Sequence, residues 1–138
     1  MITWGGGECG QLGSGYMWDD PRPRLLQDLH GVLQIGAGLR HSMAVRATDD
    51  PRFTEVWAWG YNGYGELGLG DADPRLQPTR VSALDRARVT HVSCGDRHTL
   101  FLTNYTPLLT KEDPILSGYF DAIEVSYFVI LWGMSALH

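Results

Sequence analysis

The chain contains very little lysine. Of its 138 residues, 11 are Lys or Arg and 16 are Asp or Glu, and Lys111 is the single lysine. The formal net charge is −5 and the sequence pI is about 5.4. Binding of a nucleic acid backbone requires clustered Lys and Arg, and nuclear import signals are built from the same residues. We therefore expect no nucleic acid partner for this segment alone, and we find no import signal.

Cysteines and long hydrophobic runs are also scarce. Cys9 and Cys94 are the two cysteines, and neither has a second cysteine at metal-ligand spacing. This favours a reducing compartment over a disulfide framework. The longest apolar-rich tract, residues 122–137, contains Glu124 and is shorter than the roughly 20 residues of a membrane span. No secretory signal pattern opens the chain. We expect a soluble protein with no membrane partner.

Glycine and proline, by contrast, are abundant. The 17 Gly and 7 Pro favour short strands joined by turns, while 43% hydrophobic residues suffice for a core. The 20% of charged residues is not typical of a disordered chain. The stretch Val56–Gly70 illustrates the pattern, because it opens as a strand and becomes a loop with five glycines. Such a density of glycine predicts positive φ angles or close backbone approach.

This stretch has a counterpart earlier in the chain. Residues 3–15 match residues 58–70 at an offset of 59 − 4 = 55. Residues 35–42 match residues 92–99 at an offset of 95 − 38 = 57, so a two-residue length difference lies in the linker before these segments. An internal period in this range is typical of a repeat architecture.

The repeated residues carry a family resemblance. A Trp-Gly pair, a Gly-Gln/Glu-Leu-Gly segment, a Pro-containing connection and a Gly-x-x-His segment follow one another twice within residues 2–103. This arrangement resembles the regulator of chromosome condensation repeat. The resemblance implies an all-β fold, a β-propeller built from four-stranded antiparallel blades. The best-known members of this family have seven such blades. The resemblance also implies a cytoplasmic or nuclear location.

The order of β-forming segments agrees with part of such a propeller. We expect one complete blade at about 32–81, with part-blades on either side. The expected strands are 2–5, 24–26, 32–36, 41–45, 55–59, 79–81, 89–93, 99–103 and 125–132. Residues 104–138 are treated as an atypical tail. Within it, Ile130–Gly133 resembles Ala58–Gly60, which leaves open a degenerate third repeat start or an unrelated tail.

Two histidines recur at equivalent positions and invite a chemical interpretation. His41 and His98 each follow an Arg and precede a hydroxyl residue, so they could be metal ligands or general bases. Recurrence once per unit favours a structural role instead. In Asp96–Thr99, adjacent strand residues point to opposite faces, so these residues are poorly placed for a catalytic triad.

Three further sequence patterns also favour a structural role over a functional one. Gly63–Gly68 matches G-x-G-x-x-G, but no periodic helix follows and no G-x-x-x-x-G-K-[ST] occurs, so turn geometry explains it. Four aromatic residues are expected to pack in the core and between blades: Trp4, Trp57, Trp59 and Tyr64. A mixed cluster of Arg and Asp is expected to form a solvated loop surface: Arg75, Arg80, Arg86, Arg88, Asp71, Asp73 and Asp85.

The loops at 14–24, 46–54 and 71–78 differ between the units and are the best candidates for partner binding. We predict no catalytic, cofactor-binding or metal-binding residue, and assign no individual residue to partner binding. The leading hypothesis is a non-enzymatic protein-interaction module.

The resemblance implies three roles for such a module: guanine nucleotide exchange on a small GTPase, scaffolding, or regulation of a ubiquitin ligase. One alternative is an enzyme on the propeller face that uses the non-repeating acids Asp19, Asp20, Asp71 and Asp73. The other alternative is a truncated product without independent activity. Because two repeats cannot close a ring, we expect the chain to need further blades, a partner or self-association.

Overall fold

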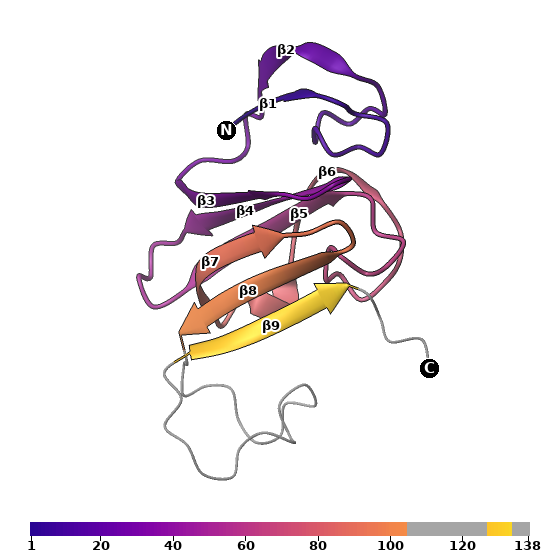
Figure 1. Cartoon of the computed structure of the whole chain (residues 1–138). Helices are drawn as coiled ribbons and strands as arrows, with labels where there is room; N and C mark the ends of the chain where they lie inside the picture. The colour runs from indigo at the N-terminus through magenta and orange to yellow at the C-terminus, as the bar shows by residue number, and fades with distance from the viewer. Residues whose placement is uncertain (105–126, 134–138) are drawn as a thin grey trace, which may run out of the picture.

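The computed structural model describes residues 1–104 and 127–133 of the chain as three antiparallel sheets (Figure 1). The first sheet contains β1 (Ile2–Gly5) and β2 (Asp20–Leu25). The second contains β3 (Val32–Ala37), β4 (His41–Ala47), β5 (Thr54–Gly60) and β6 (Arg75–Arg80). The third contains β7 (Arg88–Cys94), β8 (His98–Asn104) and β9 (Tyr127–Gly133), and a short 3-10 helix, η1 (Ser82–Leu84), precedes it. The described part of the chain is thus almost entirely β-structure.

The three sheets are stacked as successive blades. Figure 1 shows the β3–β6 sheet between the β1–β2 sheet on one side and the β7–β9 sheet on the other. We call them the first, second and third blade in chain order. Within each blade, strands adjacent in sequence are neighbours in space. The second blade has all four strands, which confirms the complete blade predicted at about 32–81.

Strand pairing repeats in register between the units. The pairs Ile2↔Leu25 and Gly5↔Asp20 in the first blade become Trp57↔Arg80 and Gly60↔Arg75 in the second, at an offset of 55 throughout. Pairs between β3 and β4 likewise reappear between β7 and β8 at an offset of 57, and the bulge in β3 reappears in β7. The internal repeat read from the sequence is therefore a repeat of hydrogen-bond register.

Two strands begin four residues earlier than the sequence predicted. β2 begins at Asp20 and not at residue 24, and β6 begins at Arg75 and not at residue 79. The prolines in these segments suggested loops, but both strands lie at the edge of their sheets. An outward-facing N–H at an edge needs no partner, so proline is tolerated there. The first glycine-rich loop therefore spans residues 6–19 and ends before the end of the loop predicted at 14–24. The second spans residues 61–74 and ends before the end of the loop predicted at 71–78.

The core lies between the blades. Val56 and Ala58 of β5 pack with residues of the third blade, including Phe101, while Trp59 packs with Leu29 and Ala44 on the side of the first blade. This division follows from the alternation of side chains along a strand. The second blade is consequently covered by the third blade on one face and in part by the first blade on the other, where Leu33 and Ile35 of β3 stay exposed.

Strand β9 takes the place in the third blade that β5 takes in the second. His98 and Thr99 pair with Gly133 and Trp132, just as His41 and Ser42 pair with Gly60 and Trp59. Residues 130–133 thus occupy the register positions of residues 57–60. The division of the chain at residues 103 and 104 remains a prediction, because residues 105–126 and 134–138 lie outside the described part.

Candidate interaction surface

The first glycine-rich loop docks onto the second blade through backbone groups. The carbonyl oxygen of Gln11 accepts hydrogen bonds from Ser42 Oγ and from Trp59 Nε1, each at 2.8 Å. The amide of Gly15 donates to the carbonyl of Leu76 at 2.9 Å. A shaped backbone is needed to present these groups, which accounts for the glycines of this loop.

The same contact recurs one unit later and includes a histidine. Thr99 Oγ1 donates to the carbonyl oxygen of Glu66 at 2.9 Å, at the positions equivalent to Ser42 and Gln11. His41 Nε2 lies 2.9 Å from Thr99 Oγ1. Because the only hydroxyl proton of Thr99 is directed at Glu66, His41 acts as the donor, which assigns its proton to Nε2. His41 therefore joins the second blade to the third, which is the structural role predicted for it.

His41 is held neutral at physiological pH. Its side chain is 1% exposed and its Nδ1 has no hydrogen-bond partner. Burial, with a smaller contribution from the charge of His98, lowers the pKa of His41 from 6.5 to about 4. A buried neutral imidazole with a fixed tautomer is a packing element and is poorly suited to act as a general base near neutral pH.

The buried histidine makes stability depend on pH. The folded-state pKa of His41 is depressed, so its contribution is complete above pH 6.5 and is lost as pH falls towards 4. We expect the free energy of unfolding to fall by about 2 kcal/mol across this window, after allowance for solvent screening. Urea denaturation between pH 7 and pH 4 measures this. The variant His41→Gln should lose most of the pH dependence in this window; an unchanged slope would contradict the assignment.

No catalytic arrangement forms around Asp96–Thr99. The hydroxyl of Thr99 is hydrogen-bonded to Glu66 and His41, while Asp96 is exposed next to Arg97. Both cysteines are free thiols, in agreement with the predicted lack of a disulfide framework. Burial raises the pKa of Cys94 to about 11, against a smaller opposing effect of the Thr99 hydroxyl, so its thiol is an unreactive neutral group at pH 7.

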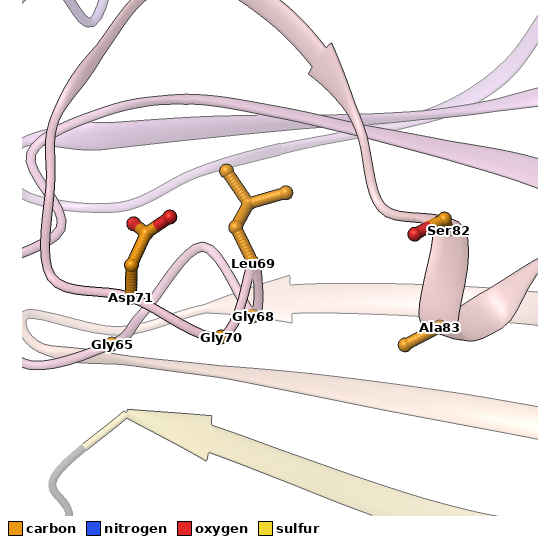
Figure 2. A pocket seen from close by; sticks show the side chains of 7 residues that line it. All are labelled: Gly65, Gly68, Leu69, Gly70, Asp71, Ser82 and Ala83. Carbon is orange, nitrogen blue, oxygen red and sulfur yellow. The ribbon is translucent and has the colours of Figure 1, made fainter.

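The Gly63–Gly68 string forms a turn and not a phosphate cradle. It borders a hollow of about 440 Å³ (Figure 2), whose lining residues are Gly65, Gly68, Leu69, Gly70, Asp71, Ser82 and Ala83. The segment that follows the loop is β6, and the helical residues on the lining, Ser82 and Ala83, belong to η1, a 3-10 helix of three residues that is too short to form a phosphate site at its N-terminus. The only ionisable side chain on its lining is the carboxylate of Asp71, which would repel a phosphate.

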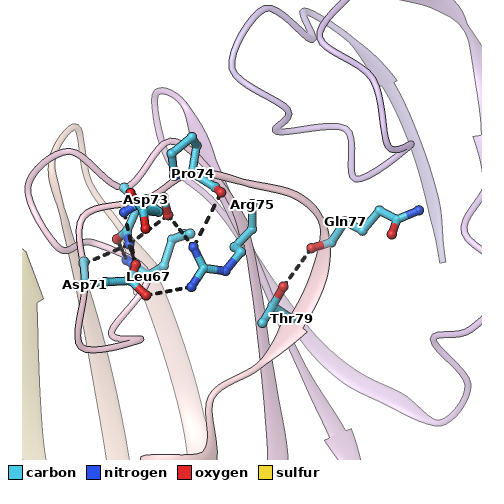
Figure 3. A network of polar contacts seen from close by, with 8 residues as sticks. Leu67, Asp71, Asp73, Pro74, Arg75, Gln77 and Thr79 are labelled. Atoms are coloured by element: carbon cyan, nitrogen blue, oxygen red, sulfur yellow. Dashed lines mark hydrogen bonds and ion pairs between the residues drawn. The ribbon is translucent and has the colours of Figure 1, made fainter.

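The second glycine-rich loop is closed by its own polar network (Figure 3). The buried Asn62 donates from Nδ2 to the carbonyls of Asp71 and Asp73, at 3.0 and 3.1 Å, and its Oδ1 accepts from the amide of Leu67 at 3.0 Å. Arg75 Nη2 contacts Asp71 Oδ2 at 2.7 Å, and this hydrogen bond is the main cause that lowers the pKa of Asp71. Arg75 thus holds the loop, and is more than part of a solvated surface.

The two glycine-rich loops differ at several positions, and at residues 16–18 the difference exposes large apolar side chains. Tyr16, Met17 and Trp18 stand where the second unit has Asp71, Ala72 and Asp73. All three are exposed, Trp18 by 59%, and the rings of Tyr16 and Trp18 stack with centroids 4.2 Å apart and planes 9° apart. We call residues 16–18 the aromatic loop.

The backbone on either side of the aromatic loop is fixed. The amide of Gly15 is bonded to the second blade, and Asp19 Oδ1 accepts from the amide of Gly7 at 2.9 Å. A Cβ at Gly7 would collide with the carbonyl of Trp18, so the two loop segments approach closely. The sequence prediction included these residues in its loop at 14–24 but did not single them out. Comparison of the two units at an offset of 55 was the signal that could have done so.

The non-repeating acids do not converge on one site. Asp20 contacts Arg24 and the amide of Arg22, Asp19 contacts Gly7, and Asp71 contacts Arg75. The hydrogen bond from the Arg22 amide, followed by that from Arg24, lowers the pKa of Asp20. A general acid requires the opposite shift. Among residues 1–104 and 127–133, no group of three His, Cys, Asp or Glu residues is arranged to hold a metal ion.

One of the four aromatic residues expected in the core and between blades lies elsewhere. Trp4 is 60% exposed, because it holds the position of Trp59 in a blade that has no described neighbour on its outer side. Trp59 is 0% exposed and Trp57 is half-buried. Tyr64 is partly exposed but packs between blades, since it stacks under Arg97 of the turn between β7 and β8, whose Cζ lies 4.7 Å from the ring centroid.

The remaining arginines agree better with the predicted solvated surface. Arg80, Arg86 and Arg88 are exposed, and Arg80 at the end of the outer strand β6 forms ion pairs with Glu55 of β5 and with Asp85. In the described residues, no helix is long and apolar enough to cross a membrane.

A four-stranded antiparallel blade whose strand pairing repeats in the sheets on either side, and which is joined to the next by a glycine-rich loop and a buried histidine, defines a repeat protein of the β-propeller class. The family model described as "Regulator of chromosome condensation (RCC1) repeat" matches residues 1–45 and 55–102, and a second model of the same description matches residues 32–66. The chain belongs to this family, as the sequence resemblance indicated.

The chain is similar to parts of several larger proteins. It is 36% identical over 105 residues to the "Ultraviolet-B receptor UVR8" of Arabidopsis thaliana, covering 75% of this chain and 23% of that protein. It is 36% identical over 106 residues to the human "Probable E3 ubiquitin-protein ligase HERC3", covering 75% of this chain and 10% of that protein. The chain therefore spans less than a quarter of the length of these relatives.

Solved structures show the same architecture. Prp20p of Saccharomyces cerevisiae superposes with a TM-score of 0.57 at 28% identity, over 74% of this chain and 24% of that one. Human WBSCR16 superposes with a TM-score of 0.62 at 21% identity, over 94% of this chain and 34% of that one, and supports the fold alone. The partial-propeller fold predicted from the sequence is thus confirmed.

Proposed function

We propose that this chain is a non-enzymatic protein-interaction module, without a cofactor, whose partner docks on the aromatic loop. The observation that carries the proposal is the stacked, exposed Tyr16–Trp18 pair with Met17 beside it, at positions where the other unit has a self-contained polar loop. These three residues differ from their counterparts in the second unit and leave their side chains exposed.

The chemistry of the aromatic loop suits a protein partner. Tyr, Trp and Met are enriched in the cores of protein interfaces, and Trp and Tyr are enriched among the residues that carry most of the binding energy. The loop backbone is fixed by Gly15 and Asp19, so little conformational entropy is lost on binding. An exposed apolar group on a fixed loop is a typical interaction site.

A small GTPase is the first partner to test. The description of the Prp20p structure refers to its binding properties to Gsp1p and histones. The acidic net charge of this chain does not favour nucleic acid, which leaves a protein surface as the target. A regulatory role within a ubiquitin ligase is the second candidate and rests on the similarity to HERC3. Both roles are consistent with a cytoplasmic or nuclear location.

The test is a titration of the chain with nucleotide-free Gsp1p by calorimetry. We expect Trp18→Ala to weaken binding by at least about tenfold, since truncation of such an anchor typically raises the binding free energy by 2 kcal/mol or more. Leu39→Ala, which removes an equally exposed apolar side chain on another turn, is the control and should bind like the parent chain. Equal losses in both variants would contradict the aromatic loop as the site. Failure of the parent chain to bind Gsp1p would leave the ligase role to be tested.

A further inference from the structure

The first blade has an unpaired edge. In the described residues, β1 pairs only with β2, whereas its equivalent β5 pairs with β4 on one edge and β6 on the other. The carbonyl of Met1 accepts a hydrogen bond from Leu26, which follows β2. By alternation along the strand, the backbone N–H and C=O groups of Ile2 and Trp4 point to the opposite, unpaired edge. This edge is ready to accept another strand.

Next to this edge, the face of β3 in the second blade is apolar and uncovered in the described residues. Leu33 and Ile35 of β3 are exposed, Ile35 by 64%. The residue equivalent to Ile35 in the third blade is Val92, which packs against Gly36 of β3, where a Cβ would lie 3.4 Å from a Val92 methyl group. The seam between β3 and β7 therefore shows what normally covers this face: the innermost strand of a preceding blade.

The opposite end of the molecule offers the complementary edge. There, β9 pairs with β8 and places a Trp-Gly pair, Trp132-Gly133, opposite Thr99 and His98. β5 places Trp59-Gly60 opposite Ser42 and His41 in the same way. β1 ends in Trp4-Gly5, the same pair at the same position of its blade. The edge of β8 is thus matched to β1 in sequence and in register.

We propose that β9 is an internal stand-in for β1 of a second copy, and that exchange of the two strands joins copies head to tail. In the exchanged form, β7 and β8 of one copy combine with β1 and β2 of the next into a complete four-stranded blade. β7 of the first copy then covers Leu33 and Ile35 of the next, through the seam already formed by β3 and β7 within the chain. This explains both uncovered surfaces at once.

Covalent attachment makes β9 the stronger competitor at low concentration. β9 is joined to β8 by residues 105–126, so it meets the edge of β8 at an effective concentration on the order of millimolar. A second copy at micromolar concentration cannot displace it. The chain should therefore be monomeric when dilute and should associate when the pairing of β9 is weakened.

Proline substitutions test this by removing single backbone donors. Ile130 holds the position of Trp57, so its N–H points to β8. Ile130→Pro removes this donor and weakens the pairing of β9 with β8. We expect its solution mass, measured by light scattering, to rise from 15.4 kDa to at least twice that value at concentrations where the parent chain stays monomeric. Adding Ile2→Pro, which removes a donor from the unpaired edge of β1, should restore 15.4 kDa, and adding Ile2→Val should not. A monomeric Ile130→Pro variant, or no effect of Ile2→Pro, would overturn the proposal.

A register-specific disulfide separates ordered exchange from aggregation. The proposed pairing places Thr3 of one copy opposite Leu100 of another, at the positions of Ala58 and Met43. This type of pair has Cα atoms about 4.5 Å apart, which a disulfide can bridge. Chains carrying Thr3→Cys and Leu100→Cys, each with Cys9→Ser, Cys94→Ser and Ile130→Pro, should crosslink when mixed under oxidation. Replacing Leu100→Cys by Leu102→Cys shifts the register and should reduce the yield several-fold; equal yields would contradict the pairing.

The strand exchange is independent of the aromatic loop. Adding Trp18→Ala to the parent chain or to any of these variants should leave its association state, measured as solution mass, unchanged, because Trp18 lies outside both strands that exchange. Loss of Gsp1p binding with unchanged association, or the reverse, would therefore identify which of the two proposals fails.

Discussion

The variant Trp59→Ala is expected to lower the free energy of unfolding by about 3–5 kcal/mol, the usual range for truncating a buried Trp. Trp59 is 0% exposed and packs between the first and second blades with Leu29 and Ala44. Its indole N–H also donates to the carbonyl of Gln11, so truncation removes a hydrogen bond across the seam. Urea denaturation followed by circular dichroism measures the change.

The matched control for this variant is Trp4→Ala. Trp4 holds the same position one unit earlier but is 60% exposed, so it has little buried area to lose. We expect its loss to stay below about 1 kcal/mol, as for most exposed positions. If Trp59→Ala destabilises the chain as little as Trp4→Ala does, the seam between the blades contributes little to stability.

The second large effect is expected for Gly60→Ala. Gly60 ends β5 with φ of 103°, and a Cβ there would lie 2.5 Å from the carbonyl oxygen of Arg40 and 2.8 Å from Cα of His41. Neither backbone atom can yield without shifting the turn before His41. We expect a loss of about 3 kcal/mol or more, the sum of a strained backbone and a steric clash. Thermal unfolding monitored by calorimetry would show the change.

Gly5→Ala separates the two causes. Gly5 has φ of 105°, nearly identical to that of Gly60, but no atom lies within 4 Å of a Cβ placed there. The alanine should therefore show only the cost of the left-handed backbone, about 1–2 kcal/mol. If Gly60→Ala is no more destabilising than Gly5→Ala, the close approach of the Arg40 turn is not a constraint on folding.

Features that recur in both units could be predicted from the sequence. The order of β-forming segments correctly predicted the complete second blade, and the recurrence of His41 and His98 indicated the structural role of His41, which joins the second blade to the third. The strand boundaries at Asp20 and Arg75 were missed, because proline is read as a breaker unless the strand is known to lie at an edge.

Features that depend on one particular neighbour could not be predicted in this way. Trp4 and Trp59 are equivalent in sequence, and only the presence of a preceding blade decides which one is buried. Likewise, the polar closure of residues 71–75 by Asn62 depends on a side chain whose equivalent in the first unit is Gly7. The aromatic loop is exposed where that closure is absent.

The repeated residues of the two units maintain the fold, and we propose that the aromatic loop, which does not repeat, binds the partner. The most direct test replaces Tyr16, Met17 and Trp18 together by serine and measures both the free energy of unfolding and the affinity for Gsp1p. We predict a loss of stability of no more than about 1.5 kcal/mol, the value of one aromatic stacking pair, together with a loss of binding of at least tenfold. A loss of stability comparable to that of Trp59→Ala, or binding equal to that of the parent chain, would contradict this division.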